Sequence, residues 1–162
     1  MVDVERFNLS RAVALPVASD VAYAMVADIT RMGEWSPVCK VCTWDDAAST
    51  GLGAWFTGKN VVRDFEWETH CEVVAATPGE EFAWIVGGAD EGVVRWGYRF
   101  RAVGDGCEVE ESWRISRLRG PLGEMSDDDA DALVARTTKS IERTLANLEA
   151  ASNEAPELAE SN

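Results

Sequence analysis

The chain has 162 residues, of which 46% are hydrophobic and 27% are charged, a size and composition that fit one globular domain. Fifteen Lys and Arg against twenty-nine Asp and Glu give a net charge of −14, so a polyanion such as DNA or an anionic membrane surface would be repelled. The sequence also lacks an apolar run long enough to cross a bilayer and a secretory signal pattern, and we expect a cytoplasmic protein with no nucleic-acid partner and no membrane insertion.

The N-terminal part of the chain is predicted to form one strand followed by two short helices. Residues 5–14 alternate weakly, and Pro16 ends the strand because proline has no backbone donor. Ser19 or Asp20 can cap the first helix, in which apolar residues recur at helical spacing. A second short helix follows after a break and ends before Pro37.

The middle of the chain is predicted to form an antiparallel meander. Runs of β-branched and aromatic residues alternate with Gly and Pro, and the connections are too short for crossover helices. Asp105 and Gly106 form the clearest tight hairpin turn. The predicted strands cover residues 38–44, 53–61, 63–76, 81–87, 93–103 and 107–117.

The C-terminal segment is predicted to form one long helix. Ser126 and the three aspartates Asp127–Asp129 can cap its start, and capping explains these aspartates better than calcium binding, which needs spaced ligands and a turn glycine. Apolar residues at helical spacing extend the helix to about Ala151. Residues 152–162 contain three glutamates and no basic residue, so we predict an acidic, disordered tail after a single domain of residues 1–151.

Short motifs spread along the chain carry a resemblance to a known superfamily. They lie at residues 14–16, 27–37, 53–60, 67–73, 78–84, 106–113 and 144–148. In this order the chain resembles the SRPBCC superfamily of START-related and polyketide cyclase/dehydrase-like proteins, from residue 5 to about residue 150. The resemblance implies an α+β helix-grip fold, in which a curved antiparallel sheet of about seven strands wraps around the long C-terminal helix and leaves a cavity between them.

Strand alternation predicts which side chains face this cavity, because positions two apart share a face of a strand. The odd positions from Phe65 to Val73 face inward, while the glutamates and His70 between them face water. Trp67, Trp84, Trp96 and Trp113 are placed to fill the core or to line a cavity, and Trp35 is placed over the cavity opening, as part of a lid. The predicted ligand contacts are Trp35, Phe56, Asn60, Trp67, Thr69, Trp84, Trp96, Tyr98, Glu111, Trp113, Thr137 and Ile141.

Glu111 is the one carboxylate on the apolar inner face. Burying it in the ionised form is costly, so its pKa would rise unless it met a cation or several donors. Two interpretations are open. Glu111 lies at the open end of its strand, hydrated or paired with an arginine, or it contacts a ligand hydroxyl or acts as an acid or base with Tyr98 as its polar partner.

Cys39 and Cys42 form a C-x-x-C motif, which is found in redox motifs and in half of a zinc site. No second pair follows at zinc spacing, and the single histidine, His70, is expected on the exposed face. We therefore expect free thiols packed as small hydrophobic groups, and neither a metal nor a cofactor.

The favoured functional hypothesis is binding of a hydrophobic or aromatic small molecule, such as a lipid or a polyketide-like compound, without turnover. It rests on the inward tryptophans and the scarcity of inward polar groups. One alternative is a polyketide cyclase or dehydratase in which Glu111 and Tyr98 transfer protons. Another is a protein-interaction module that uses the acidic surface or the tail, for which the sequence names no partner.

Overall fold

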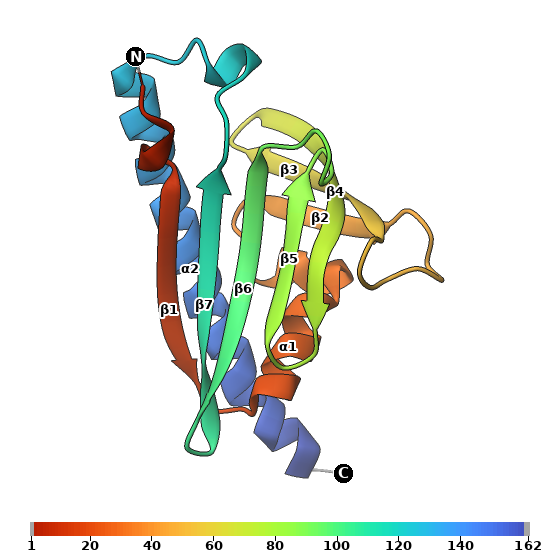
Figure 1. Cartoon of the computed structure of the whole chain (residues 1–162). Coiled ribbons are helices and arrows are strands. Elements are labelled where there is room, and N and C mark those ends of the chain that lie inside the picture. Colours follow the sequence, from red (N-terminus) through yellow and green to blue (C-terminus); the bar gives the residue numbers. More distant parts are fainter. Residues whose placement is uncertain (1, 161–162) are drawn as a thin grey trace.

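A seven-stranded antiparallel sheet curves around one long helix in this computed structural model, which describes residues 2–160 and their side chains as far as Glu154 (Figure 1). The strand order is β1-β7-β6-β5-β4-β3-β2. The strands are β1 (Asn8–Leu15), β2 (Cys39–Trp44), β3 (Trp55–Val62), β4 (Phe65–Thr77), β5 (Glu81–Val86), β6 (Val94–Val103) and β7 (Gly106–Ile115). The α-helices are α1 (Ser19–Ala27) and α2 (Asp127–Glu160), and the 3-10 helices are η1 (Val4–Arg6), η2 (Ile29–Glu34) and η3 (Gly120–Leu122).

This architecture confirms the predicted α+β helix-grip class. α1 and η2 are the two short helices expected after the first strand, and α2 lies along one face of the sheet (Figure 1). Register shifts in β2, between Cys39 and Val41, and in β4, between Val73 and Ala75, are bulges. Bulges bend a strand and increase its twist, which helps this sheet to curve.

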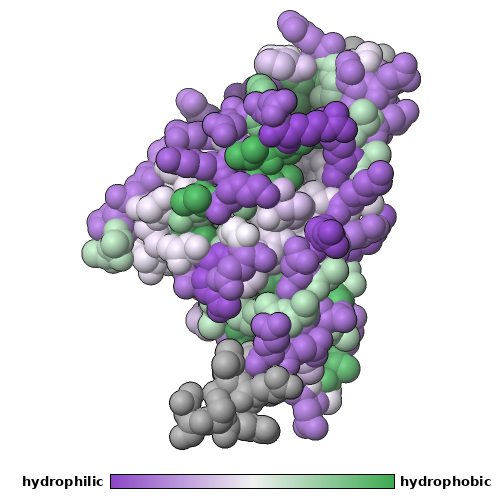
Figure 2. All heavy atoms as spheres, turned by 180° about the vertical axis from the view of Figure 1, so that it is seen from behind, coloured by the Kyte–Doolittle hydropathy of each residue, from purple (hydrophilic) through white to green (hydrophobic). Residues whose placement is uncertain are grey.

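The two faces of the sheet differ in polarity as the alternation predicts. In β7, Val109, Glu111 and Trp113 are buried against the helix side of the sheet, while Arg114 between the inward positions is exposed. Phe65 departs from the prediction, because it stands at the hairpin where β4 begins and is 68% exposed. Figure 2 shows that hydrophilic residues cover most of the face seen from behind, as the high charge of the chain leads one to expect.

Helix α2 begins at its predicted cap and continues past its predicted end. The Ser126 backbone N–H donates to Oδ2 of Asp129 at 3.4 Å, and the Asp129 backbone N–H donates back to Ser126 Oγ at 3.1 Å, which is the reciprocal pattern of a capping box. The helix runs to Glu160 and not to about Ala151, and Ser152 is fully buried. Alanine, glutamate and leucine in this segment are good helix formers. The prediction of a disordered tail gave more weight to the acidic composition than to this helix propensity. The last two residues of the predicted tail lie outside the described residues.

Among residues 2–160, no helix has both the length and the apolar character needed to cross a bilayer.

Candidate ligand-binding cavity

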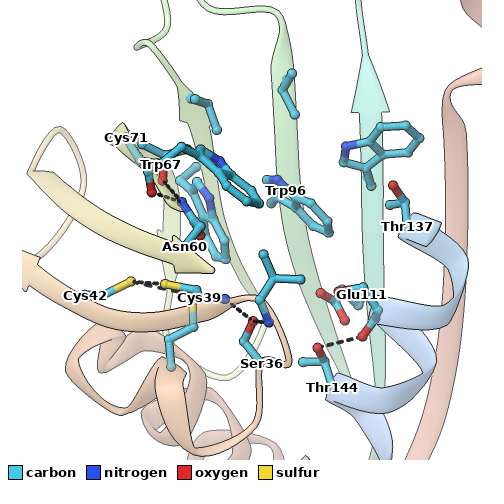
Figure 3. Close-up of a pocket in the computed structure, with 18 of the residues that line it drawn as sticks. Ser36, Cys39, Cys42, Asn60, Trp67, Cys71, Trp96, Glu111, Thr137 and Thr144 are labelled. Atoms are coloured by element: carbon cyan, nitrogen blue, oxygen red, sulfur yellow. Dashed lines mark hydrogen bonds between the residues drawn. The ribbon is translucent and has the colours of Figure 1, made fainter. Parts of the chain in front are cut away.

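A cavity of about 390 Å³ lies between the concave face of the sheet and helix α2 (Figure 3). Strands β2 to β7 all contribute side chains to its wall, and α2 closes it from the other side. The lining is mostly apolar, with a few polar groups from the strands and the helix. Volume and lining are those of a site for a small organic molecule.

Ten of the residues predicted from the sequence meet around this cavity. They are Phe56, Asn60, Trp67, Thr69, Trp84, Trp96, Tyr98, Glu111, Trp113 and Thr137. Strand alternation located most of them, because residues that point to the same face of neighbouring strands form one continuous wall.

Trp35 and Ile141 do not line the cavity. Trp35 is only 2% exposed, so it is a packed residue and not the lid over an opening that the sequence predicted. The Arg31 guanidinium lies 5.1 Å from the Trp35 ring centroid, and the Trp35 carbonyl accepts a hydrogen bond from Asn147 of α2 at 2.9 Å. Ile141 is fully buried in the core. On α2, Thr137, Ser140 and Thr144 line the cavity. Ile141 lies on the neighbouring part of the helix surface, which packs into the core.

The hydrogen bond from Asn147 fastens the η2 segment to α2. We expect Asn147→Ala to lower the free energy of unfolding by about 1 kcal/mol, because the Trp35 carbonyl loses its donor. Urea denaturation followed by circular dichroism measures this change. Asn153→Ala is the matched control, since Asn153 is exposed on the same helix, and an equal loss in both variants would contradict the prediction.

Several lining residues were not among the predicted ligand contacts. Ser140 and Thr144 follow Thr137 at helical spacing and were therefore identifiable as members of its face. Cys39 and Cys42 gave no such signal, because residues three apart in a regular strand point to opposite faces. Cys71 was predicted to face inward but was not counted as a ligand contact, and the other lining residues outside that list are Met32, Ser36, Val38, Val62, Val86, Val94, Leu133 and Arg136.

Aromatic side chains form one wall of the cavity. The Trp84 ring stacks on Tyr98 with 5.9 Å between centroids, and Phe56 meets Trp84 edge-on at 5.7 Å. Trp96 contacts Trp113 on the neighbouring strand at 6.3 Å. These rings pack against one another and also face the hollow, so core packing and cavity lining, which the sequence left as alternatives, occur together.

Glu111 and Tyr98 form a buried polar pair in this wall. They are direct partners in the register of β6 and β7, and both point inward. The Tyr98 hydroxyl donates a hydrogen bond of 2.9 Å to Oε1 of Glu111, whereas Oε2 of the same carboxyl is buried and has no hydrogen-bond partner. Buried polar atoms are normally satisfied, so this oxygen is a candidate for contact with a ligand.

Burial controls the protonation of this pair. Glu111 is 3% exposed and lies within β7, and no Arg, Lys or His forms an ion pair with it among the described residues, so the interpretation of an arginine-paired carboxylate at the open end of the strand is wrong. Desolvation raises the pKa of Glu111 to about 8, although the hydrogen bond from Tyr98 opposes the shift. Desolvation, followed by the charge of Glu111, also raises the pKa of Tyr98. At neutral pH the pair is therefore a neutral acid and a neutral phenol.

A second polar group lies on β3. The Asn60 amide nitrogen donates to the Thr69 hydroxyl at 3.2 Å and to the Trp67 carbonyl at 3.4 Å, which holds the side chain against the cavity wall. Figure 3 shows Asn60 beside Trp67, while Glu111 lies toward Thr137 and Thr144 of α2. The cavity thus offers two separated polar positions on an apolar background.

His70 lies outside this cavity, as predicted. It is exposed on the outer face, where Nε2 lies 2.5 Å from Oδ2 of Asp45 and the ring packs on Trp55 at 4.5 Å between centroids. The single histidine of the chain is therefore not among the residues that line this cavity.

Comparison with known proteins places this geometry in context. Residues 6–153 match a family model described as polyketide cyclase / dehydrase and lipid transport. A polyketide cyclase-like protein from Corynebacterium glutamicum, Cgl2372, is 31% identical over 93% of both chains, with a TM-score of 0.67. The sequence matches no curated protein.

Two further solved structures share the fold at lower identity. Protein Ms6760 from Mycobacterium smegmatis is 15% identical over 96% of both chains, with a TM-score of 0.68. StfQ, a di-domain ARO/CYC from the steffimycin biosynthetic pathway, is 12% identical with a TM-score of 0.73, and the match covers 94% of this chain and 53% of StfQ.

Proposed function

The chain belongs to the polyketide cyclase / dehydrase and lipid transport family, and from this membership and the cavity we propose that it binds a hydrophobic, aromatic small molecule carrying an oxygen acceptor. The family and the fold support a ligand-binding or cyclase-like role. One observation carries the finer proposal. A carboxyl oxygen of Glu111 is buried in an aromatic cavity without a partner.

The protonation of Glu111 defines the kind of ligand atom that would fit. Below its raised pKa the carboxyl is neutral, Oε1 accepts from Tyr98, and the O–H on the other oxygen is free to donate. A carbonyl or hydroxyl oxygen on the ligand would accept this hydrogen bond, while the rings of Trp84 and Trp96 would pack against its apolar body. A ligand carboxylate would accept the same bond but would itself have to be desolvated in the apolar cavity.

Tryptophan fluorescence tests this proposal, because several indole rings line the cavity. We expect a hydroxylated anthraquinone to quench the fluorescence in a saturable way and Glu111→Leu to weaken its binding about tenfold, since the variant lacks the donor. The wild-type affinity should also fall as the pH rises above about 8, where Glu111 loses its proton.

Glu110→Leu is the matched control for this titration. Glu110 precedes Glu111 on the same strand and does not line the cavity, so its replacement should leave the affinity unchanged. Absence of saturable quenching in the wild-type protein would contradict the proposed ligand class, and equal affinities of Glu111→Leu and Glu110→Leu would contradict the role of Glu111. Native mass spectrometry of the freshly purified chain is an independent readout of a retained compound.

The same carboxyl supports a second candidate function, a dehydratase or cyclase. Protonated Glu111 would give its proton to a departing hydroxyl of a poly-β-ketone, so that the carbon–oxygen bond breaks and water leaves. The resulting carboxylate would take a proton from the neighbouring carbon, which restores the acid and leaves a carbon–carbon double bond. Incubation with a short β-hydroxy ketone distinguishes the two roles, because turnover yields a product lighter by one water and binding alone does not.

A further inference from the structure

A bulge in β2 places two cysteines on the same face of the strand. Cys39 is paired with Asn60, whereas Val41 is paired with Lys59, so one extra residue is inserted between the two cysteine positions. In a regular strand residues three apart point to opposite faces. The inserted residue restores the same direction for Cys39 and Cys42, which are both buried, while the two residues between them are exposed.

The two sulfur atoms lie close enough to react with each other. Cys39 Sγ and Cys42 Sγ are 3.0 Å apart, within about 1 Å of the length of a disulfide bond (Figure 3). Met32 Sδ lies 3.7 Å from Cys42 Sγ. The pair packs against Gly58 of β3, where a Cβ would lie at ordinary contact distance from both sulfur atoms, 3.4 Å from Cys39 Sγ and 3.5 Å from Cys42 Sγ.

The environment makes the two thiols unequal. The pKa of Cys39 is lowered, chiefly because the Cys42 thiol donates a hydrogen bond to it, and the pKa of Cys42 is raised by that same hydrogen bond and by burial. Cys71 also lines the cavity, but burial raises its pKa to about 12. A thiolate is the reactive form of cysteine, so Cys39 is the favoured nucleophile and Cys42 the second thiol of the pair.

The cavity gives small reagents access to this pair. Cys39 and Cys42 are shielded from bulk solvent but line the cavity wall, whereas Cys107 is buried and does not line it. Among the described residues no group of three or more His, Cys, Asp or Glu side chains is placed to hold a metal ion, which distinguishes the pair from a zinc site.

We propose that Cys39 and Cys42 are a redox-active dithiol in the wall of the cavity, which a low-molecular-weight disulfide oxidises to an intramolecular disulfide. The Cys39 thiolate attacks one sulfur of the reagent, so that the reagent's disulfide bond breaks, a mixed disulfide forms on Cys39, and one reagent thiolate leaves. The Cys42 thiol then loses its proton and attacks the Cys39 sulfur, which releases the second reagent thiolate. Both leaving thiolates take up protons, so two protein thiols are oxidised and one reagent disulfide is reduced to two thiols.

Such a bond would change the cavity wall itself. The sulfur atoms would move together from 3.0 Å, and the bulged segment of β2 between the two cysteines would lose freedom. In a reducing compartment a disulfide of this kind is transient and responds to the redox state.

Disulfide exchange on the full-length chain tests this proposal directly. The reduced protein is treated with bis(hydroxyethyl) disulfide, quenched with an alkylating agent and mapped by peptide mass spectrometry. We expect a Cys39–Cys42 crosslink with the loss of two hydrogen atoms, while Cys71 and Cys107 remain available for alkylation after unfolding. A crosslink that involves Cys71, or reaction of Cys107 while Cys39 and Cys42 stay reduced, would overturn the proposal.

Serine variants test the order of the two steps. Cys42→Ser should accumulate the mixed disulfide on Cys39, because the second thiol is missing, and Cys39→Ser should slow reaction at Cys42 at least about tenfold. Cys107→Ser is the control and should crosslink at the wild-type rate, because Cys107 is buried away from the cavity. Failure of Cys42→Ser to hold the reagent on Cys39 would contradict the assignment of the nucleophile. The wild-type map decides the existence of the crosslink even where a variant folds poorly.

Discussion

Raising the pH from about 5 to about 9 is expected to remove about 4 kcal/mol of folding free energy through Glu111 alone. The folded protein holds the carboxyl proton more tightly than the unfolded chain, because burial raises the pKa of Glu111 from its ordinary value of 4.5 to about 8. Between these two values the folded state binds more protons than the unfolded state, so stability falls as the pH rises. The loss is complete above the folded pKa, where ionised Glu111 stands buried without a cation.

Urea denaturation of the wild-type protein and Glu111→Gln at several pH values measures this effect. Glutamine has nearly the same shape and does not ionise, so the stability advantage of the variant over wild type should grow by about 4 kcal/mol from about pH 5 to about pH 9. The difference between the two proteins removes the contribution of the many surface carboxylates, which both share. Glu110→Gln is the control on the same strand, and a difference that did not change with pH would show that Glu111 is ionised in the folded state throughout.

This pH dependence links the stability of the protein to its proposed function. The same proton that avoids a buried charge also makes Glu111 a hydrogen-bond donor toward the cavity. Ligand binding through this donor would hold the proton on Glu111 and shift its titration to still higher pH. The free energy of unfolding and the ligand affinity, each plotted against pH, should therefore both change slope near the raised pKa of Glu111.

Strand alternation predicted the inward direction of Tyr98 and Glu111 and so allowed them to be partners, but it did not give the register that places them directly opposite each other. The sequence predicts a turn at Asp105 and Gly106, and with that turn Tyr98 would stand opposite Trp113. In the structure Val103 is paired with Gly106, and the turn is formed by Gly104, with a φ of 59°, and Asp105. A shift of the turn by one residue changes every cross-strand partner, and here it brings the phenol and the carboxyl together.

Two other features depended on contacts that are distant in sequence. The bulge that aligns Cys39 with Cys42 exists in the pairing of β2 with β3 and has no local signature in the chain. Trp35 was expected at an opening because it follows a short helix, yet its position is decided by packing under Arg31 and by the hydrogen bond from Asn147. Local pattern predicts the direction of a side chain, whereas long-range packing decides what it meets.

Helix α2 has one side that packs in the core and one side that lines the cavity, and truncations on the two sides should differ in their effect on the free energy of unfolding. We expect Ile141→Ala to lower the free energy of unfolding by about 3 kcal/mol, because Ile141 is fully buried in the packed core and its truncation leaves a void. Thr137→Ala, one turn earlier on the cavity side, should cost less than about 1 kcal/mol, since the hollow is already present and the Thr137 hydroxyl only bonds back to the Leu133 carbonyl.

Parallel urea denaturation of Ile141→Ala, Ile141→Val and Thr137→Ala checks this division. The valine variant keeps most of the buried volume and should lose only about 1 kcal/mol. Anthraquinone binding by the folded Ile141→Ala protein should match wild type, because the lining residues are unchanged. Equal losses in free energy of unfolding for Ile141→Ala and Thr137→Ala would mean that both side chains are equally tightly packed. The space between sheet and helix would then not be a preformed ligand cavity.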